Sequence, residues 1–269
     1  MDTSTKELKN STPVVSVCMV TYNREDFIAE AIDSVLMQDY VDWELIIVDD
    51  ASTDRTRAVV EKFNDPRIRY YQNKTNQDVS RARNTALAHV LGKFVAVIDS
   101  DDVWIDPEKL SKQVRYLSRE SDVVLVGTRA VTINGAGEGM EHLKNPVGDK
   151  DIRKVMLRKN PFVHSSVMFR YQQVRDMGGY NEDYTTSEDY ELFLRLGKVG
   201  KFINFPRYMV GYRMHSGNII VSRRASAMKI SVRIVLSFRN EYPHFYSAFV
   251  RRLVRYVGYF IFASFGVIK

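Results

Sequence analysis

Residues 94–102 have the sequence FVAVIDSDD, and this stretch decides the fold. Five apolar residues are followed at once by three carboxylates, Asp99, Asp101 and Asp102. A continuous apolar run of this kind is typical of a strand covered on both faces of a parallel sheet. Carboxylates this close repel one another unless a cation lies among them, and carboxylates are suitable ligands for Mg²⁺ or Mn²⁺. An acidic turn, or a solvated helix start, is the alternative to a ligand site.

Further short apolar runs alternate with helical patterns on either side of this stretch. The runs predict strands at residues 14–20, 45–48, 68–71, 94–98, 123–126 and 167–169. Helices are predicted at residues 25–38, 52–63, 80–91 and 188–196, and from 106 onwards, with a turn at 134–139. This order indicates an α/β fold with a mostly parallel, Rossmann-like central sheet and helices on both faces.

Polar residues also follow the first two predicted strands. Thr21 and Tyr22 follow the first strand, and Asp50 follows the second. Right-handed crossovers bring the carboxyl ends of these strands to one edge of the sheet, which is where ligands bind in such folds. There Asp50 could accept a hydrogen bond from a pyrimidine N–H, and Tyr22 could pack on a flat base. Ordinary turn chemistry is the alternative for each residue taken alone.

For Arg83, and for the pair Glu188 and Asp189, the local sequence alone does not decide the role. Arg83 lies near a helix start, where a cation and backbone N–H groups could meet a phosphate or a base. Glu188 and Asp189 begin the helix predicted at 188–196. Acidic residues in a first turn are favoured by the helix dipole, so capping is the default interpretation of that pair.

Taken together, these segments resemble the inverting family 2 glycosyltransferases of the GT-A fold, over about residues 14–217. The resemblance rests on seven motifs that occur in one order: TYN at 21–23, DDASTD at 49–54, ARN at 82–84, DSDDVW at 99–104, GGY at 178–180, SEDYELFLRL at 187–196 and YRMH at 212–215. Each motif alone carries little information, whereas the ordered set is highly specific. One departure is Asp78, because relatives often have glycine at this position, and the geometry of its loop is therefore in question.

The resemblance implies a role for each matching residue. The donor nucleotide would be bound by Thr21, Tyr22, Asp50, Arg83, Asp99 and Asp101. An Mn²⁺ or Mg²⁺ ion on the donor diphosphate would be held by Asp101 or Asp102, with His215 as a further ligand or as a buried structural histidine. Asp189 would be the general base, with Glu188 beside it as a substitute or orienting group. One base without a nucleophile implies a single displacement with inversion.

Charge is unevenly distributed along the chain. Residues 223–269 contain nine basic residues and one acidic residue, whereas the other 222 residues contain 30 basic and 32 acidic residues. Within this tail, residues 256–268 are uncharged but span only thirteen positions, fewer than the roughly 20 that cross a bilayer. A helix lying in the membrane interface, facing anionic headgroups, is therefore expected. A helix that packs on the core is the alternative.

We also predict how the chain is divided into segments and where in the cell it lies. A disordered lead-in is predicted at residues 1–13, a catalytic domain at 14–222 with halves at 14–126 and 127–222, and a helical tail at 223–269. A lone cysteine, Cys18, and an amino terminus without an apolar stretch indicate a cytoplasmic protein. Peripheral association with the inner face of the cell membrane follows from the tail.

The function expected from these features is transfer of a sugar from a nucleotide-sugar, chiefly a UDP-sugar, to a hydroxyl of a lipid-linked or other glycan acceptor in surface-polysaccharide assembly. Two alternatives stay open: a nucleotidyltransferase, and an inactive relative that serves as a membrane assembly factor. The Gly-rich loop of a nucleotidyltransferase is missing after the first strand. No G-x-G-x-x-G motif of a dehydrogenase occurs. Nucleic acid is not an expected partner, because the tail ends in an aromatic, uncharged stretch.

Overall fold

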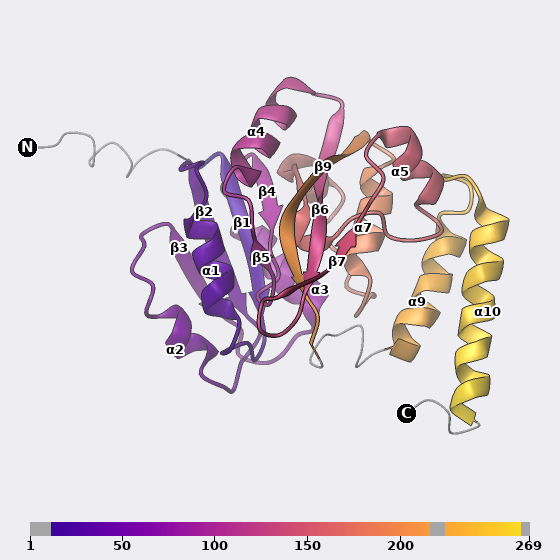
Figure 1. Ribbon diagram of the computed structural model, residues 1–269, viewed down its shortest axis with the longest axis horizontal. Helices are drawn as coiled ribbons and strands as arrows, with labels where there is room; N and C mark the ends of the chain where they lie inside the picture. Colours follow the sequence, from indigo (N-terminus) through magenta and orange to yellow (C-terminus); the bar gives the residue numbers. More distant parts are fainter. Residues whose placement is uncertain (1–11, 216–223, 265–269) are drawn as a thin grey trace, which may run out of the picture.

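The computed structural model describes residues 12–215 and 224–264, and Figure 1 shows one central sheet with helices packed around it. Nearly all of the predicted lead-in therefore lies outside the described residues. One continuous sheet contains strands from both predicted halves of the catalytic domain. The division near residue 126 stays a prediction.

The sheet has nine strands in the order β3-β2-β1-β4-β8-β6-β9-β5, with β7 paired to β6. Their bounds are β1 Val15–Thr21, β2 Trp43–Asp49, β3 Ile68–Gln72, β4 Phe94–Val97, β5 Val103–Trp104, β6 Val123–Ile133, β7 Gly139–Leu143, β8 Met168–Arg170 and β9 Lys201–Arg213. The first four strands in this order are parallel, as the apolar runs predicted.

The second half of the sheet departs from the predicted pattern. Strand β8 pairs antiparallel with both β4 and β6, and β5 pairs antiparallel with β9. The sheet is therefore mixed. Strand β9, the longest of the nine, was not predicted, and β6 continues seven residues beyond the predicted end at residue 126.

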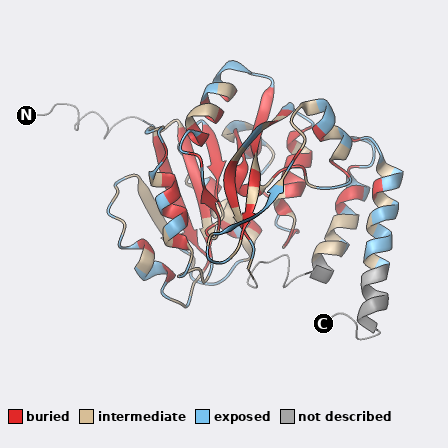
Figure 2. Ribbon diagram, viewed as in Figure 1, coloured by how far each residue is buried: buried red, intermediate tan, exposed pale blue. Residues whose placement is uncertain are grey.

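Helices cover both faces of the sheet, as predicted. They are α1 Ile28–Leu36, α2 Thr56–Val60, α3 Val79–Ala88, α4 Lys109–Arg119, α5 Asp149–Val155, α6 Tyr171–Asp176, α7 Glu188–Leu196, α9 Arg224–Ser237 and α10 Phe245–Ser264, with the 3₁₀ turn η2 at His164–Ser166. Alternate residues of β1 face opposite layers, since Val17 and Met19 belong to the core with α1 and α4, whereas Cys18 belongs to the core with α3 and α7. Figure 2 shows the resulting buried strands between half-exposed helices.

The basic tail forms α9 and α10, which lie side by side next to the sheet and its covering helices (Figure 1). Ala248 of α10 and Ile234 of α9 are fully buried in the core that contains α7. The tail therefore does pack on the core, through one of its faces. Among the described residues, no helix has the length and apolar character that a membrane crossing requires. Residues 265–268 of the uncharged run lie outside the described part of the chain.

Candidate active site

The carboxyl ends of three parallel strands meet at one edge of the sheet. Thr21 at the end of β1 is in register with Asp49 at the end of β2, and Cys18 of β1 is in register with Val97 at the end of β4. Most of the predicted donor residues lie at the ends of these strands or directly after them, whereas Arg83 lies on α3. The parallel register therefore brings together side chains that lie up to 80 positions apart in the sequence.

Two of the loops at this edge bind each other directly. The backbone N–H of Asn23 donates to Ser52 Oγ at 2.9 Å, and the N–H of Thr53 donates to Asn23 Oδ1 at 2.8 Å. Asn23 and Ala51 both have positive φ, 51° and 66°. The TYN and DDASTD motifs thus fold as a single, reciprocally hydrogen-bonded unit.

The predicted nucleobase residues lie on this unit. Asp50 is buried, and its carboxylate accepts hydrogen bonds from Asn73 Nδ2 at 2.8 Å and from the N–H of Gln77 at 3.0 and 3.1 Å. Tyr22 is 44% exposed, as a side chain that packs on a flat ligand must be. Thr21 is buried beneath it, and its Oγ1 has no hydrogen-bond partner within the described part of the chain.

The loop that Asp50 holds ends at Asp78, the residue that departs from the family pattern. Asp78 precedes α3 with φ 71° and ψ 158°. This region of backbone conformation is occupied almost only by glycine, because a Cβ atom collides with the neighbouring peptide there. This conformation favours glycine, which the family resemblance led us to expect here, and Asp78 therefore occupies a strained backbone conformation.

Arg83 projects from α3 into a buried cluster rather than towards the nucleobase residues. Its Nη2 donates to Asp99 Oδ1 at 3.1 Å, and its Nε lies 3.0 Å from Glu188 Oε1. The side chain is 11% exposed, and His164 and Tyr180 lie against the guanidinium. The guanidinium thus links the aspartate loop to α7 through its two neighbouring carboxylates, and the predicted contact of Arg83 with the donor nucleotide stays a prediction.

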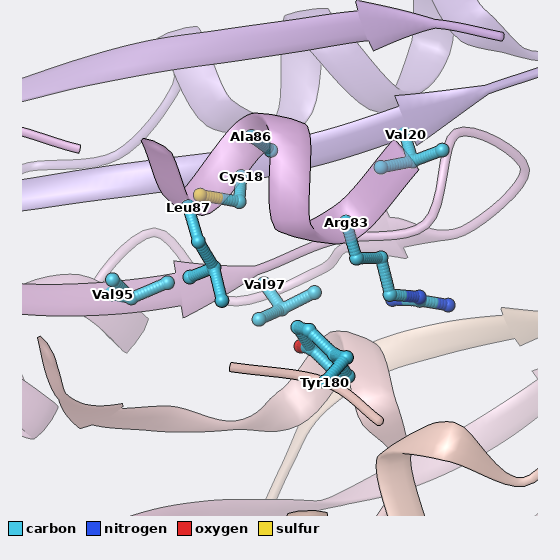
Figure 3. A pocket seen from close by; sticks show the side chains of 8 residues that line it. All are labelled: Cys18, Val20, Arg83, Ala86, Leu87, Val95, Val97 and Tyr180. Carbon is cyan, nitrogen blue, oxygen red and sulfur yellow. The ribbon is translucent and has the colours of Figure 1, made fainter. Parts of the chain in front are cut away.

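A small cavity lies beneath this guanidinium, between α3 and the sheet. Figure 3 shows the eight side chains that line it, which are Cys18, Val20, Arg83, Ala86, Leu87, Val95, Val97 and Tyr180. Most of them are apolar, and burial raises the pKa of the Cys18 thiol, so the cysteine is held in its unreactive form. The cavity belongs to the packing of α3 on β1 and β4.

Asp101 and His215 meet beside the donor loop. His215 Nε2 lies 2.9 Å from Asp101 Oδ2, and Arg24 Nε lies 3.1 Å from the same oxygen. The imidazole and carboxylate are partly buried, at 13% and 14% exposure. One nitrogen and one oxygen ligand suit Mn²⁺, which takes its remaining oxygens from phosphate and water. Residues 12–215 and 224–264 contain no group of three or more His, Cys, Asp or Glu side chains that could hold a metal alone.

Asp102 has a different environment from its neighbour, being 1% exposed. Its Oδ1 accepts the backbone N–H of Arg213 at 2.8 Å, and its Oδ2 accepts the hydroxyl of Ser165. Burial raises the pKa of Asp102, and the charges of Asp101 and Asp99 raise it further. Both carboxylate oxygens of Asp102 thus bind protein groups, and its predicted role as a metal ligand stays a prediction.

Glu188 and Asp189, the two acidic residues at the start of α7, also lie in different environments. Glu188 is buried beside Arg83, and burial raises its pKa, as does the charge of Asp189, while Arg83 lowers it. Asp189 is half-buried, and its Oδ2 accepts a hydrogen bond from Asn160 Nδ2 at 2.9 Å. Ser187 has a left-handed backbone with φ 61° and makes no side-chain cap. Glu188 and Asp189 do lie in the first turn of α7, the position that the helix dipole favours for acidic residues.

Several residues that support the site were not predicted. His164 and Ser165 contact the aspartate loop, Asn160 contacts Asp189, and Arg213 donates from Nε to the carbonyl of Asp101 at 2.8 Å. Arg213 belongs to the YRMH motif at 212–215, but its burial, at 1% exposure, becomes visible only in the folded chain. The others lie in a segment whose Asn, His and Ser residues are typical of any loop.

Comparison with known proteins agrees with this arrangement. Residues 16–176 match the model of the family described as Glycosyl transferase family 2. The chain is 33% identical over 232 residues to the putative glycosyltransferase EpsE of Bacillus subtilis, which covers 84% of the chain and 82% of that protein. It is 39% identical over 123 residues to the Escherichia coli UDP-Glc:alpha-D-GlcNAc-diphosphoundecaprenol beta-1,3-glucosyltransferase WfgD, covering 46% of the chain and 48% of that protein.

A solved structure gives the same fold. The mannosyltransferase PcManGT from Pyrobaculum calidifontis, in complex with GDP-Man and Mn²⁺, aligns with a TM-score of 0.66 at 21% identity, over 90% of this chain and 69% of that one. The mixed sheet and its covering helices are therefore the same fold as that of this solved structure.

Proposed function

Because the chain belongs to glycosyltransferase family 2, it is a glycosyltransferase, and we propose that it moves a sugar from a UDP-sugar to a hydroxyl of a lipid-linked glycan. The observation that carries the proposal is the 2.9 Å approach of His215 Nε2 to Asp101 Oδ2 at the sheet edge. This edge also presents Tyr22 and Asp50. A diphosphate at Asp101 would place its nucleoside over the β1 and β2 loops.

Asp101 and His215 are the residues that would hold a divalent cation, since their nitrogen and oxygen atoms already converge in this chain. A cation there would neutralise the charge that develops on the leaving nucleoside diphosphate. Arg24, on the same carboxylate oxygen, adds a fixed positive charge to this side of the site. Asp99, in the same loop, is proposed to bind the donor nucleotide as well.

The nucleoside is proposed to be uridine, with Asp50 accepting its N–H and Tyr22 packing on its ring. The relative WfgD takes its name from UDP-Glc, which supports uridine. PcManGT carries GDP-Man in its structure. Because a guanine and a uracil both present an N–H to a carboxylate, the nucleotide is the first variable to test.

Asp189 is proposed as the general base. Its carboxylate takes the proton of the acceptor hydroxyl while that oxygen forms a bond to the anomeric carbon, and the bond from this carbon to the diphosphate oxygen breaks with its electron pair leaving on the diphosphate. A single displacement of this kind inverts the anomeric carbon. Asn160 holds Asp189 Oδ2, which fixes the direction of the other oxygen. Glu188, buried on Arg83, orients the turn rather than receiving the proton.

The acceptor is proposed to be presented at a membrane surface. The outward side chains of α10 include four apolar residues that are 46–82% exposed: Tyr246, Val250, Val254 and Val257. Arg251 and Arg255 are exposed beside them, where they would face anionic headgroups. The name of WfgD specifies a diphosphoundecaprenol acceptor, which supports a lipid-linked substrate for this chain as well.

A panel of nucleotide-sugars, incubated with the full chain and Mn²⁺ or EDTA, tests the proposal. We expect metal-dependent release of UDP from at least one UDP-sugar, with water as the acceptor, and loss of that release in Asp101→Asn. Release of pyrophosphate from a nucleoside triphosphate and a sugar phosphate would instead identify a nucleotidyltransferase. An inactive assembly factor would release nothing from any donor and bind none of them.

A further inference from the structure

The turn η2, His164–Ser166, lies directly behind the aspartate loop although it is more than 60 residues away in the sequence. Ser165 and Ser166 are both fully buried, and His164 is 7% exposed. Buried hydroxyl groups keep their hydrogen-bond partners, since an unsatisfied one would be costly. The hydrogen-bond partners of Ser165 and Ser166 therefore show which segments the turn η2 holds in place.

The hydroxyl of Ser165 binds two of the three aspartates. Its oxygen accepts the backbone N–H of Asp99 at 3.0 Å, and its proton is donated to Asp102 Oδ2. The carbonyl of Ser165 accepts Trp104 Nε1 at 2.8 Å. A serine hydroxyl has one proton to donate, so the direction of this hydroxyl is determined. Both ends of the loop at residues 99–102 are therefore attached to one oxygen atom.

Asp102 connects Ser165 to Arg213, which lies on the other side of the site. Its second oxygen accepts the N–H of Arg213 at 2.8 Å, and Arg213 Nε donates to the carbonyl of Asp101 at 2.8 Å. His215 follows Arg213 by two residues and meets Asp101 Oδ2. The hydrogen bonds thus run from Ser165 through Asp102 and Arg213 to the pair of side chains proposed to hold the cation.

We propose that Ser165 is a positioning residue for the donor diphosphate and its cation, acting through Asp99 and Asp102 on the Asp101–His215 pair. The inference rests on the proposed function. Loss of the hydroxyl would leave Asp102 Oδ2 without its buried donor and would release Asp99 at the same time. Residues that orient metal ligands through hydrogen bonds typically change metal affinity by 10- to 100-fold when they are replaced.

Ser166 provides a matched control in the next position. Its hydroxyl donates to the carbonyl of Val163 at 2.7 Å and accepts the N–H of Thr128 at 3.3 Å, so both of its partners are backbone groups away from the aspartates. Ser165→Ala and Ser166→Ala each remove one fully buried hydroxyl from the same turn. A purely structural contribution would therefore affect the two variants alike.

The experiment measures Mn²⁺ binding to the full chain in the presence of UDP, from the electron paramagnetic resonance of free Mn²⁺, together with donor KM and kcat. We expect Ser165→Ala to weaken Mn²⁺ affinity about 10- to 100-fold and to raise donor KM, while Ser166→Ala stays within about twofold of the parent. An unchanged Mn²⁺ affinity in Ser165→Ala, or an equal loss in Ser166→Ala, overturns the inference.

Asp102→Asn tests the same link from its other end if Ser165→Ala does not fold. The amide keeps an oxygen for the N–H of Arg213 but presents N–H groups to the serine hydroxyl, so the same loss of Mn²⁺ affinity is expected. Retained affinity in this variant also overturns the inference. A parent protein that binds neither UDP nor Mn²⁺ refutes the proposed function itself, which separates that failure from a failure of the role of Ser165.

Discussion

At the residue scale, the site is surrounded by strained backbone positions. Four residues other than glycine have φ between 51° and 71° at the ends of elements that line it: Asn23 after β1, Ala51 after β2, Asp78 before α3 and Ser187 before α7. Such conformations persist only where surrounding contacts enforce them, and they gather at functional sites. For Asn23 and Ala51, the enforcing contacts are the reciprocal hydrogen bonds between the β1 and β2 loops.

Asp78 permits a direct measurement of this strain. Both Asp78→Gly and Asp78→Ala remove the carboxylate, but only glycine adopts φ 71° without a Cβ collision. We expect the glycine variant to be more stable than the alanine variant by about 1 kcal/mol, measured by urea unfolding. Equal stability of the two variants would show that the loop has relaxed and that no strain is held there.

Asp101 and Asp102 show how far the sequence determines the site. The motif predicted that carboxylates lie at this edge, because the apolar run places them at the end of a strand. It could not distinguish the two, since the burial of Asp102 depends on Ser165 and Arg213, which lie 63 and 111 positions away. Roles that depend on such distant partners become visible only in the folded chain.

At the element scale, Arg83 joins α3 to α7, because it belongs to α3 and its guanidinium lies beside Glu188 of α7. Asp99 of the aspartate loop lies beside the same guanidinium. Of these two carboxylate partners of Arg83, Glu188 is the one whose titration can be followed through the free energy of unfolding at different pH values. Its folded-state pKa is raised by burial, so the folded protein binds this proton more tightly than the unfolded chain does. The stabilisation by this group is present below its ordinary pKa near 4.5 and is lost as the pH rises through the folded value.

Glu188→Gln removes this titration while keeping the shape of the side chain. We therefore expect the stability of the parent, relative to Glu188→Gln, to fall as the pH is raised from 4.5, measured as unfolding free energy across the pH range. Glu182→Gln is the control with the opposite sign, because Asn84 and Arg81 lower the pKa of Glu182. A pH-independent difference for Glu188→Gln would contradict the raised pKa.

A proline explains why strand β9 was not predicted from the sequence. Pro206 and Arg207 interrupt β9, and the pairing with β6 passes over both of them, from Thr128↔Phe205 to Arg129↔Tyr208. A proline within a run argues against a strand, and only the irregular register in the structure accommodates it. The parallel strands β1, β2 and β4 were predicted because their burial on both faces requires apolar residues at successive positions.

At the scale of the whole molecule, α10 has two different faces. Its inner face is fixed to the catalytic domain, where Arg252 donates to the carbonyl of Leu157 at 3.2 Å and to the hydroxyl of Tyr190, the residue after Asp189, at 3.1 Å. Its outer face is apolar and basic. A membrane surface bound by the outer face of α10 would therefore lie beside the part of the chain that contains Asp189, the proposed general base.

Replacing outer residues tests this face. We expect the triple variant Tyr246→Ser, Val250→Ser, Val254→Ser to lose about 10- to 100-fold in binding to anionic phosphatidylglycerol vesicles, measured by co-sedimentation. The control variant replaces three equally exposed apolar residues elsewhere, Met37→Ser, Val41→Ser and Met140→Ser. Undiminished binding by the α10 variant, or an equal loss in the control, would contradict a membrane role for α10.

The most direct test of the account is UDP release by Asp189→Asn at saturating Mn²⁺, with the UDP-sugar that the parent hydrolyses and with UDP affinity measured on the same sample. Water then takes the place of the acceptor and must also lose a proton. We expect a rate about 10²- to 10⁴-fold below the parent, with UDP affinity unchanged and Asp176→Asn as active as the parent. Release at the parental rate by Asp189→Asn would contradict the assignment of the base and, with it, the proposed mechanism.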